Sequence, residues 1–156
     1  MTTAEKLALI ERYYAACSTG DVPALTDTLT DDVTHYFLAP NPGSAPVSGA
    51  LQLARYWRKA QERISGRWAV DHILGEADEA VIEWTLFWTT PVGERVATRG
   101  AEWYRFRDQR IAEIRAYYQQ PEATTELRDF DYVGRGYSRL GDEVGAARPL
   151  VPEGAR

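Results

Sequence analysis

His35 and Glu102 are the two side chains of this sequence best suited to move a proton. His35 lies in the β-rich run Val33–Leu38, and histidine has the side chain whose ordinary pKa is nearest neutrality. Glu102 shares one face of an expected strand with Tyr104 and Phe106, because side chains alternate between the two faces of a strand. A carboxylate among aromatic residues is desolvated, which raises its pKa toward the range useful to a general acid or base. We therefore expect both residues to be catalytic.

Each of these residues also has a purely structural interpretation. His35 can be an ordinary strand histidine that is exposed or bonded to a backbone group. Glu102 can form a buried ion pair with Arg99, Arg115 or an arginine of another strand, which would hold it ionised. The sequence leaves these alternatives open.

His72 and Glu83 are weaker candidates for chemistry. Asp71 precedes His72, but neighbouring strand residues point to opposite faces, so Asp71 cannot orient that imidazole directly. Glu83 interrupts an apolar run and is expected to pair with an arginine across the sheet. This run, Ala80–Thr90, is largely apolar on both faces, so periodicity does not tell which face lines a pocket.

Arginine, tyrosine, tryptophan and glutamine side chains supply candidate groups for binding a substrate. Arg115 can fix a carboxylate or stabilise an enolate-like oxyanion, and tyrosine hydroxyls can donate hydrogen bonds. Period-two alternation places Arg115 and Gln119 on one face of the last expected strand unless a bulge intervenes. The full set of expected substrate-binding residues is Tyr14, Tyr36, Trp57, Trp88, Tyr104, Arg115, Tyr117 and Gln119.

Composition limits the classes of function. The 156 residues fit one domain, and aromatic residues make up 12% of them, which suits a deep core or a lined cavity. A formal net charge of −5 argues against nucleic acid as a partner. One cysteine and two histidines favour neither a disulfide framework nor a metal site, and we expect no cofactor. The start of the chain lacks a signal-peptide pattern and no run reaches membrane-spanning length, so we expect a cytoplasmic protein that does not bind membranes.

The first third of the chain predicts helices. Thr2 and Glu5 have capping-box spacing and open a helix that continues to about Ser18. Asp21 starts a short second helix. After the run Val33–Leu38 comes a loop rich in proline and glycine, and Ser48 is expected to cap a third helix.

Four strands are predicted after Gly66: Arg67–Leu74, Ala80–Thr90, Arg95–Arg107 and Ile111–Gln119. Helices followed by an antiparallel meander indicate an α+β domain, in which three N-terminal helices pack on one face of a curved antiparallel sheet. We expect this domain to occupy residues 1–120. Residues 121–143 are expected to be an extension packed on the domain, and residues 144–156 a flexible tail.

The order of elements and several short motifs resemble the nuclear transport factor 2-like superfamily, which holds SnoaL-like polyketide cyclases, ketosteroid isomerase and limonene epoxide hydrolase. The matching positions are 15–21, Leu29 to Val33, Val47 to Gly49, Arg99-Gly100, Tyr104 to Phe106, Ile111, Ile114-Arg115 and Tyr117. The resemblance implies a cone-shaped fold with a pocket between the concave sheet and the helices. It also implies a homodimer formed through the sheet.

One departure from the family pattern affects the expected mechanism. Many enzymes of this group end the last hairpin with an aspartate, whereas this chain has Gln119 there. A glutamine can orient a carbonyl or a water, but it cannot move a proton near neutral pH. The acid–base role is therefore expected to fall to His35, with Glu102 as the second candidate.

Three functions remain in view. The leading hypothesis is a small cofactor-independent enzyme that cyclises, isomerises or dehydrates an apolar, polyketide-like or polycyclic compound. The second is a protein of the same fold that binds a small molecule or a partner without catalysis. The third is an epoxide hydrolase, which needs a carboxylate or histidine placed to activate water.

Overall fold

The computed structural model describes residues 1–141, 143 and 148–149. The first helix, α1 (Thr3–Thr19), begins with the predicted capping box. The Thr2 hydroxyl accepts a hydrogen bond from the Glu5 backbone N–H, and the Glu5 carboxylate accepts one from the Thr2 N–H. Gly20, with φ 69°, ends the helix in the left-handed conformation that glycine adopts without strain.

Two further helices follow, and the start of one of them differs from the prediction. The short α2 (Val22–Thr28) is capped by Asp21, whose carboxylate accepts from the Ala24 N–H. The third helix, α3 (Ala50–Ile64), begins at Gly49 without any side-chain cap. The prediction that Ser48 caps it is wrong, because Ser48 lies in the two-residue strand β2 (Val47–Ser48) and its hydroxyl bonds to Thr34.

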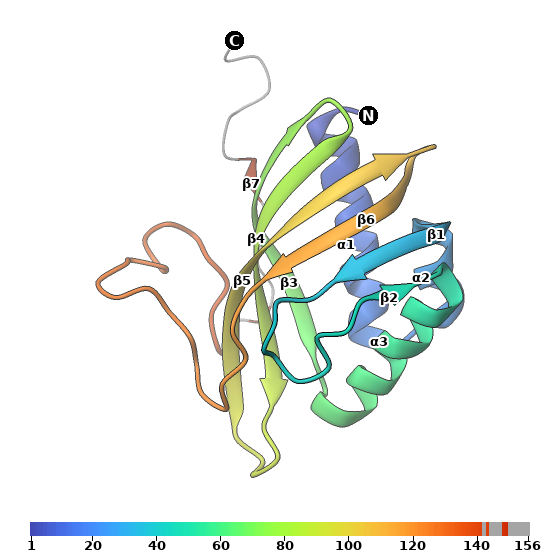
Figure 1. The fold of residues 1–156 in the computed structure, drawn as a ribbon. Helices are drawn as coiled ribbons and strands as arrows, with labels where there is room; N and C mark the ends of the chain where they lie inside the picture. The colour runs from blue at the N-terminus through green and yellow to red at the C-terminus, as the bar shows by residue number, and fades with distance from the viewer. Residues whose placement is uncertain (142, 144–147, 150–156) are drawn as a thin grey trace.

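The strands form one curved sheet in the order β2-β1-β6-β5-β4-β3-β7 (Figure 1). Their bounds are β1 Leu29–Tyr36, β3 Arg67–Glu76, β4 Glu79–Thr89, β5 Arg95–Arg107, β6 Arg110–Tyr117 and β7 Arg148–Pro149. The four strands β3 to β6 make the predicted antiparallel meander. The sheet as a whole is mixed rather than antiparallel, because β1 runs parallel to β6 and β7 runs parallel to β3. The first strand also starts four residues earlier than predicted, at Leu29.

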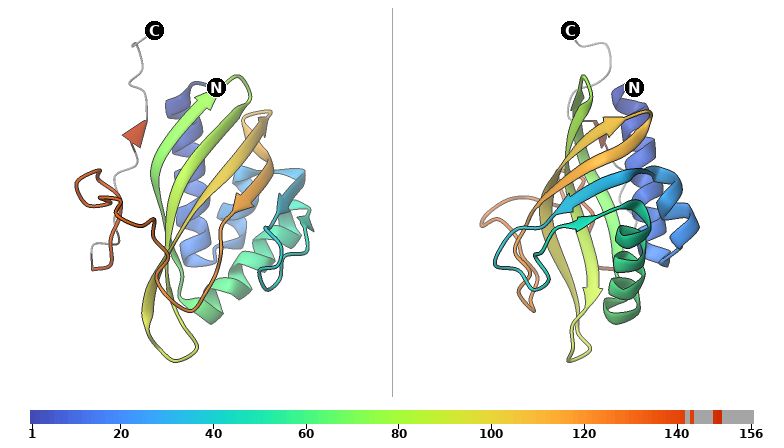
Figure 2. Two further views of the ribbon diagram at one scale, coloured as in Figure 1. Left: turned by 60° about the vertical axis from the view of Figure 1, so that its left-hand side comes forward. Right: turned by 45° about the vertical axis from the view of Figure 1, so that its right-hand side comes forward.

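The helices cover one face of the sheet (Figure 2), and the main core lies between these two layers. The side chains Ile82, Trp84, Leu86 and Trp88 of β4 belong to this core and are at most 5% exposed. The structure thereby answers the question that periodicity left open, since this face of β4 turns toward the helices. Glu102 pairs with Ile82 across β4 and β5, and both side chains turn the same way.

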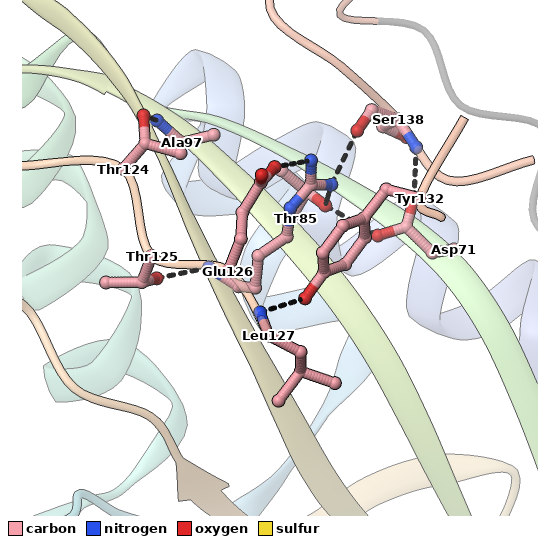
Figure 3. A network of polar contacts seen from close by, with 10 residues as sticks. Asp71, Thr85, Ala97, Thr124, Thr125, Glu126, Leu127, Tyr132 and Ser138 are labelled. Atoms are coloured by element: carbon pink, nitrogen blue, oxygen red, sulfur yellow. Dashed lines mark hydrogen bonds and ion pairs between the residues drawn. The ribbon is translucent and has the colours of Figure 1, made fainter. Parts of the chain in front are cut away.

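Residues 121–141 run over the opposite face of the sheet, which we call the outer face (Figures 1 and 3). Thr125 pairs with β5 through its backbone, its N–H donating to the Ala97 carbonyl at 2.9 Å. Arg99 donates to the Ser138 carbonyl and to the Glu126 carboxylate. The buried carboxylate of Asp71 accepts hydrogen bonds from the Ser138 N–H at 2.8 Å.

The last part of the chain was expected to be a flexible tail over residues 144–156. Positions 144–147 and 150–156 lie outside the described residues. Arg148 and Pro149 between them form β7, beside His72 and Ile73 of β3.

Candidate active site

Glu102 lies at the centre of a buried polar cluster between helix α1 and the sheet. Its position in β5 turns it toward the helices, and it is 4% exposed. The Oε2 atom of its carboxyl accepts hydrogen bonds from the hydroxyls of Tyr14 in α1 and Tyr104 in β5, each at 2.5 Å. Its Oε1 atom accepts no hydrogen bond from the described residues. One oxygen of the carboxyl is thus fixed by two donors while the other stays available.

This environment brings the pKa of the Glu102 carboxyl close to neutral pH. Burial disfavours the charged carboxylate and raises its pKa to about 7, although the Tyr104 and Tyr14 hydroxyls lower it in part. Burial, and then the nearby Glu102 carboxylate, raise the pKa of Tyr14 well above its ordinary value, and Tyr104 behaves in the same way. Near pH 7 the protonated and ionised forms of Glu102 are therefore both populated, while the tyrosines stay neutral donors.

His35, in β1, is completely buried next to this cluster. Its ring stacks on Phe37 with centroids 4.1 Å apart, and its Nε2 atom lies 3.8 Å from Glu102 Oε1. Neither ring nitrogen has a hydrogen-bond partner among the described residues. Burial lowers the pKa of His35 to about 3, so near neutrality the imidazole is uncharged and the 3.8 Å contact is not an ion pair.

A cavity of about 150 Å³ opens between α3 and the core face of the sheet, and Glu102 is part of its lining. Six of the thirteen lining residues are aromatic: Phe37, Tyr56, Trp57, Trp68, Trp84 and Tyr118. Trp57 is held in place by its indole N–H, which donates to the Tyr13 hydroxyl at 2.5 Å. The indole N–H of Trp84 is buried without an acceptor among the described residues. The cavity therefore combines apolar and aromatic walls with Glu102 and a small set of other polar side chains, the usual character of a small-molecule site.

The family model of the SnoaL-like domain matches residues 10–114 of the chain, which include every strand residue of this cluster. The chain belongs to the SnoaL-like domain family. A solved protein of unknown function with a cystatin-like fold, from Methylobium petroleophilum PM1, is 35% identical with a TM-score of 0.68, and the match covers 89% of this chain and 94% of that one.

Two more distant structures are similar to this SnoaL-like protein in fold alone. An NTF2-like protein of unknown function from Burkholderia pseudomallei is 17% identical with a TM-score of 0.65, over 76% of this chain and 92% of the other. An LEH-like epoxide hydrolase from M. tuberculosis is 21% identical with a TM-score of 0.62, over 75% and 84% of the two chains. The sequence comparison with curated proteins gave no match.

Of the residues singled out from the sequence, five gather at the Glu102 cluster of this SnoaL-like protein. Glu102 and Trp57 line the cavity. The His35 ring lies next to Glu102, with Nε2 3.8 Å from Oε1. Tyr14 and Tyr104 were expected to bind substrate oxygens. In the structure their hydroxyls hold Glu102 instead.

Three other expected binding residues lie on the outer face of the sheet, away from this cavity. Arg115 pairs with Glu79 at 3.3 Å. Tyr36 and Tyr117 are 44% and 54% exposed. The ion pair between Glu102 and Arg115 that the sequence allowed is not formed, because the two side chains belong to opposite faces.

Trp88 and Gln119 also lie elsewhere. Trp88 is a core residue whose indole N–H donates to Thr98 at 2.8 Å. Gln119 follows the end of β6 and lines a second cavity, on the outer face, together with Arg99 and residues of the C-terminal extension. That position of Arg99 also removes it as an ion-pair partner of Glu102.

The weaker candidates His72 and Glu83 meet on the outer face. Their Nδ1 and Oε2 atoms are 3.4 Å apart, and the Tyr137 hydroxyl donates to Glu83. Glu83 was expected to pair with an arginine of a neighbouring strand. The contacts found are instead with a histidine of β3 and a tyrosine of the extension.

Several residues of the cavity lining are not in the set of substrate-binding residues expected from the sequence. Trp68 and Trp84 lie in strands, where side chains alternate between the two faces of the sheet. Alternation therefore predicts that both point inward, once one inward residue of each strand is known. Tyr118 lies just past the end of β6, where alternation no longer gives a direction.

Within the described ranges there is no cluster of three histidine, cysteine, aspartate or glutamate side chains placed to hold a metal ion. None of the described helices is both long and apolar enough to cross a membrane.

Proposed function

We propose that this SnoaL-like protein is a cofactor-independent enzyme that transfers a proton beside a carbonyl or hydroxyl group of an apolar ring compound. The observation that carries the proposal is Glu102, a buried carboxyl whose pKa is raised to about 7 in the lining of an aromatic cavity. Such an acid can take a proton from one atom and return it to another without a large energetic penalty for either state. Isomerisation, cyclisation and dehydration are the reactions that this chemistry serves.

The two oxygens of Glu102 have separate roles in the proposed reaction. The hydroxyls of Tyr14 and Tyr104 hold Oε2 and fix the plane of the carboxyl. The free Oε1 abstracts a proton from the carbon next to a substrate carbonyl, and the electron pair of that C–H bond moves into an enolate. Oε1 then returns the proton to another position of the same substrate, so the enzyme ends each cycle unchanged.

The developing negative charge on the substrate oxygen needs hydrogen-bond donors. Tyr118 lines the cavity, and its hydroxyl makes no hydrogen bond with other described residues, so it can donate to that oxygen. A donor held in a water-poor site stabilises such an oxyanion more strongly than water does. Tyr118 therefore takes the role that the sequence had suggested for Arg115 and Gln119.

His35 has a different role from the one expected from the sequence. With its pKa lowered to about 3, it is not a proton donor near neutrality. An uncharged imidazole beside Oε1 also adds no positive charge that would hold Glu102 ionised. We therefore propose His35 as a positioning residue whose uncharged ring lets the pKa of Glu102 stay near 7. Glu102 is the proposed catalytic residue.

Hydrogen exchange in small ring ketones tests this proposal. We expect the wild-type protein in D₂O to accelerate the exchange of the α-protons of 2-tetralone and 1-indanone above the buffer rate, as followed by NMR. Glu102→Gln should abolish the acceleration, whereas Glu113→Gln, on the outer face, should leave it unchanged. Exchange at the buffer rate with every ketone, together with measurable binding, would instead support the non-catalytic ligand-binding function.

We also propose that two copies associate through the outer face of the sheet, as the family resemblance implies. Three large aromatic side chains there are 40 to 54% exposed: Tyr36, Trp103 and Tyr117. They lie close together, because Tyr36 and Trp103 both stand opposite Arg115 on the two sides of β6. Light scattering should give the mass of a dimer, and Trp103→Glu should give that of a monomer; a wild-type monomer would exclude this association.

A further inference from the structure

The cavity that contains Glu102 also has a cationic side. Arg63, in the last turn of α3, is the only arginine or lysine in its lining among the described residues. Its side chain is exposed and forms no ion pair within the described part of the chain. Arg63 acts electrostatically on Tyr56, whose hydroxyl belongs to the same lining, and this opposes the rise of the Tyr56 pKa caused by burial.

The helix that carries Arg63 is basic in an acidic protein. Helix α3 has four basic residues, Arg55, Arg58, Lys59 and Arg63, and one acidic residue, Glu62. Its formal charge is thus +3, whereas the whole chain has a formal charge of −5. The carboxylate of Glu62 is engaged by Arg58 at 3.4 Å, which leaves Arg63 without a neutralising neighbour on the helix. The wall of the cavity formed by α3 therefore attracts anions, although the protein as a whole repels them.

Besides Arg63, the lining includes Tyr56, Tyr118 and Gln120, whose side chains can each donate a hydrogen bond. The hydroxyls of Tyr56 and Tyr118 make no hydrogen bond with other described residues, and they lie close enough for Tyr56 to influence the pKa of Tyr118. Together with the Arg63 guanidinium they can surround an acceptor that carries negative charge. A guanidinium presents two parallel N–H donors that match the two oxygens of a carboxylate.

We propose that the ligand of this cavity is an aromatic or polycyclic carboxylate, bound with its acid group at Arg63 and its ring against the tryptophans. This inference rests on the proposed function and narrows its substrate class from apolar ring compounds to ring compounds bearing a carboxylate. The volume of about 150 Å³ encloses one aromatic ring, as an apolar cavity of that size does elsewhere, and a second fused ring of a polycyclic ligand extends from it toward Arg63. The carboxylate then lies toward the exposed Arg63, where it keeps part of its hydration.

A pair of matched probes tests the charge preference. The anion 2-naphthoate and the neutral 2-naphthamide have the same ring system and nearly the same shape. Titration calorimetry should show that wild-type protein binds 2-naphthoate more tightly than 2-naphthamide by about 5-fold, the upper part of the range for a partly exposed ion pair. Raising the salt from 50 to 500 mM should weaken the binding of the anion and leave that of the amide unchanged.

Two variants separate a direct contact from the general field of the helix. In Arg63→Gln the preference for 2-naphthoate should vanish, while the affinity for 2-naphthamide stays within 2-fold of wild type. Arg55→Gln removes the same charge from the same helix at an exposed residue outside the cavity lining, and it should keep most of the preference.

Three results would overturn the proposal. If Arg63→Gln binds 2-naphthoate as tightly as wild type, Arg63 does not hold the carboxylate. If Arg55→Gln loses as much affinity as Arg63→Gln, the preference comes from the helix as a whole. Both of these leave the proposed function standing. If wild-type protein binds neither probe, the cavity is not a ring-binding site, and the proposed function fails together with this inference.

Discussion

Replacing Glu102 by glutamine should change how the stability of the protein depends on pH. A glutamine has the shape of a protonated glutamate, and its carbonyl oxygen can accept the hydroxyls of Tyr14 and Tyr104 as Oε2 does now. The substitution therefore removes the titration of the carboxyl while keeping the hydrogen bonds around it.

The size of the effect follows from the pKa shift of Glu102, from 4.5 to about 7. Between these two pH values the unfolded chain has released the proton of Glu102 and the native protein still holds it. The proton held by Glu102 therefore stabilises the native protein at pH 4.5. This contribution to the free energy of unfolding decreases as the pH rises from 4.5 to 7 and is absent at higher pH. One pKa unit corresponds to about 1.4 kcal/mol, so the loss is about 3 kcal/mol.

His35 has an opposite effect that must be separated from this one. Its pKa is lowered from 6.5 to about 3, so the unfolded chain binds a proton there that the native protein does not. Its contribution to stability rises with pH between 3 and 6.5. The two trends offset each other in the wild-type curve, and only the difference between Glu102→Gln and wild type isolates the carboxyl.

Urea unfolding followed by tryptophan fluorescence, from pH 4.5 to 8.5, measures this difference. The stability of Glu102→Gln relative to wild type should increase by about 3 kcal/mol between pH 4.5 and 8 and then level off. Glu113→Gln, at a partly exposed carboxylate of the outer face, is the matched control for the loss of one carboxyl. A flat difference for Glu102→Gln would show that burial does not raise the pKa of this carboxyl, and the proposed mechanism would lose its basis.

Three other substitutions give further tests. Tyr14→Phe removes a donor that lowers the pKa of Glu102, so the NMR titration of that carboxyl should move upward by up to about one unit; an unchanged titration would contradict the hydrogen bond. Gly100→Ala places a methyl group 2.5 Å from the ring of Trp84. Thermal unfolding should therefore show a destabilisation of about 1–3 kcal/mol, and ligand binding should weaken. A neutral result would mean that the ring moves freely. Asp71→Ala leaves the buried Ser138 N–H without its acceptor. This should lower the free energy of unfolding in urea by about 1–3 kcal/mol and speed proteolysis of residues 121–141. Unchanged cleavage would show that other contacts hold this segment in place.

The fold was largely accessible from the sequence because its signals are local. The strand predicted at Arg95–Arg107 has the same bounds in the structure as in the prediction. It ends at a tight turn formed by Asp108 and Gln109, both with positive φ, which polar residues of this kind tolerate. The period-two pattern of this strand placed Glu102 on one face with Tyr104 and Phe106, and the family resemblance implied that this face turns inward, as the burial of Glu102 confirms.

The direction of the last strand was harder to obtain, because a bulge intervenes. Ile111 and Ile114 both turn toward the core, although simple alternation would put them on opposite faces. The register explains this: Phe106 pairs with Ile111 while the adjacent Arg105 pairs with Glu113. The extra residue leaves Arg115 on the outer face, away from the cavity. A bulge of this type depends on the partner strand, so one strand's sequence does not reveal it.

Only part of the chemistry of the site was accessible from local patterns. Tyr14 and Glu102 lie 88 residues apart, and their contact exists only because α1 packs against the sheet. The lowered pKa of His35 likewise reflects complete burial in the assembled fold, which is why we assign the proposed acid–base role to Glu102 alone. Residue types and spacing found the participants, but their roles followed from tertiary packing.

The most direct test of this account is the pKa of Glu102 itself. Carbon NMR of protein labelled at the glutamate side-chain carboxyl, titrated from pH 3 to 9, reports each glutamate, and the Glu102→Gln variant assigns the signal by its disappearance. We predict that this signal titrates near pH 7, well above the ordinary value of 4.5. A midpoint below pH 5 for this signal would contradict the proposal that Glu102 is the acid and base of the cavity.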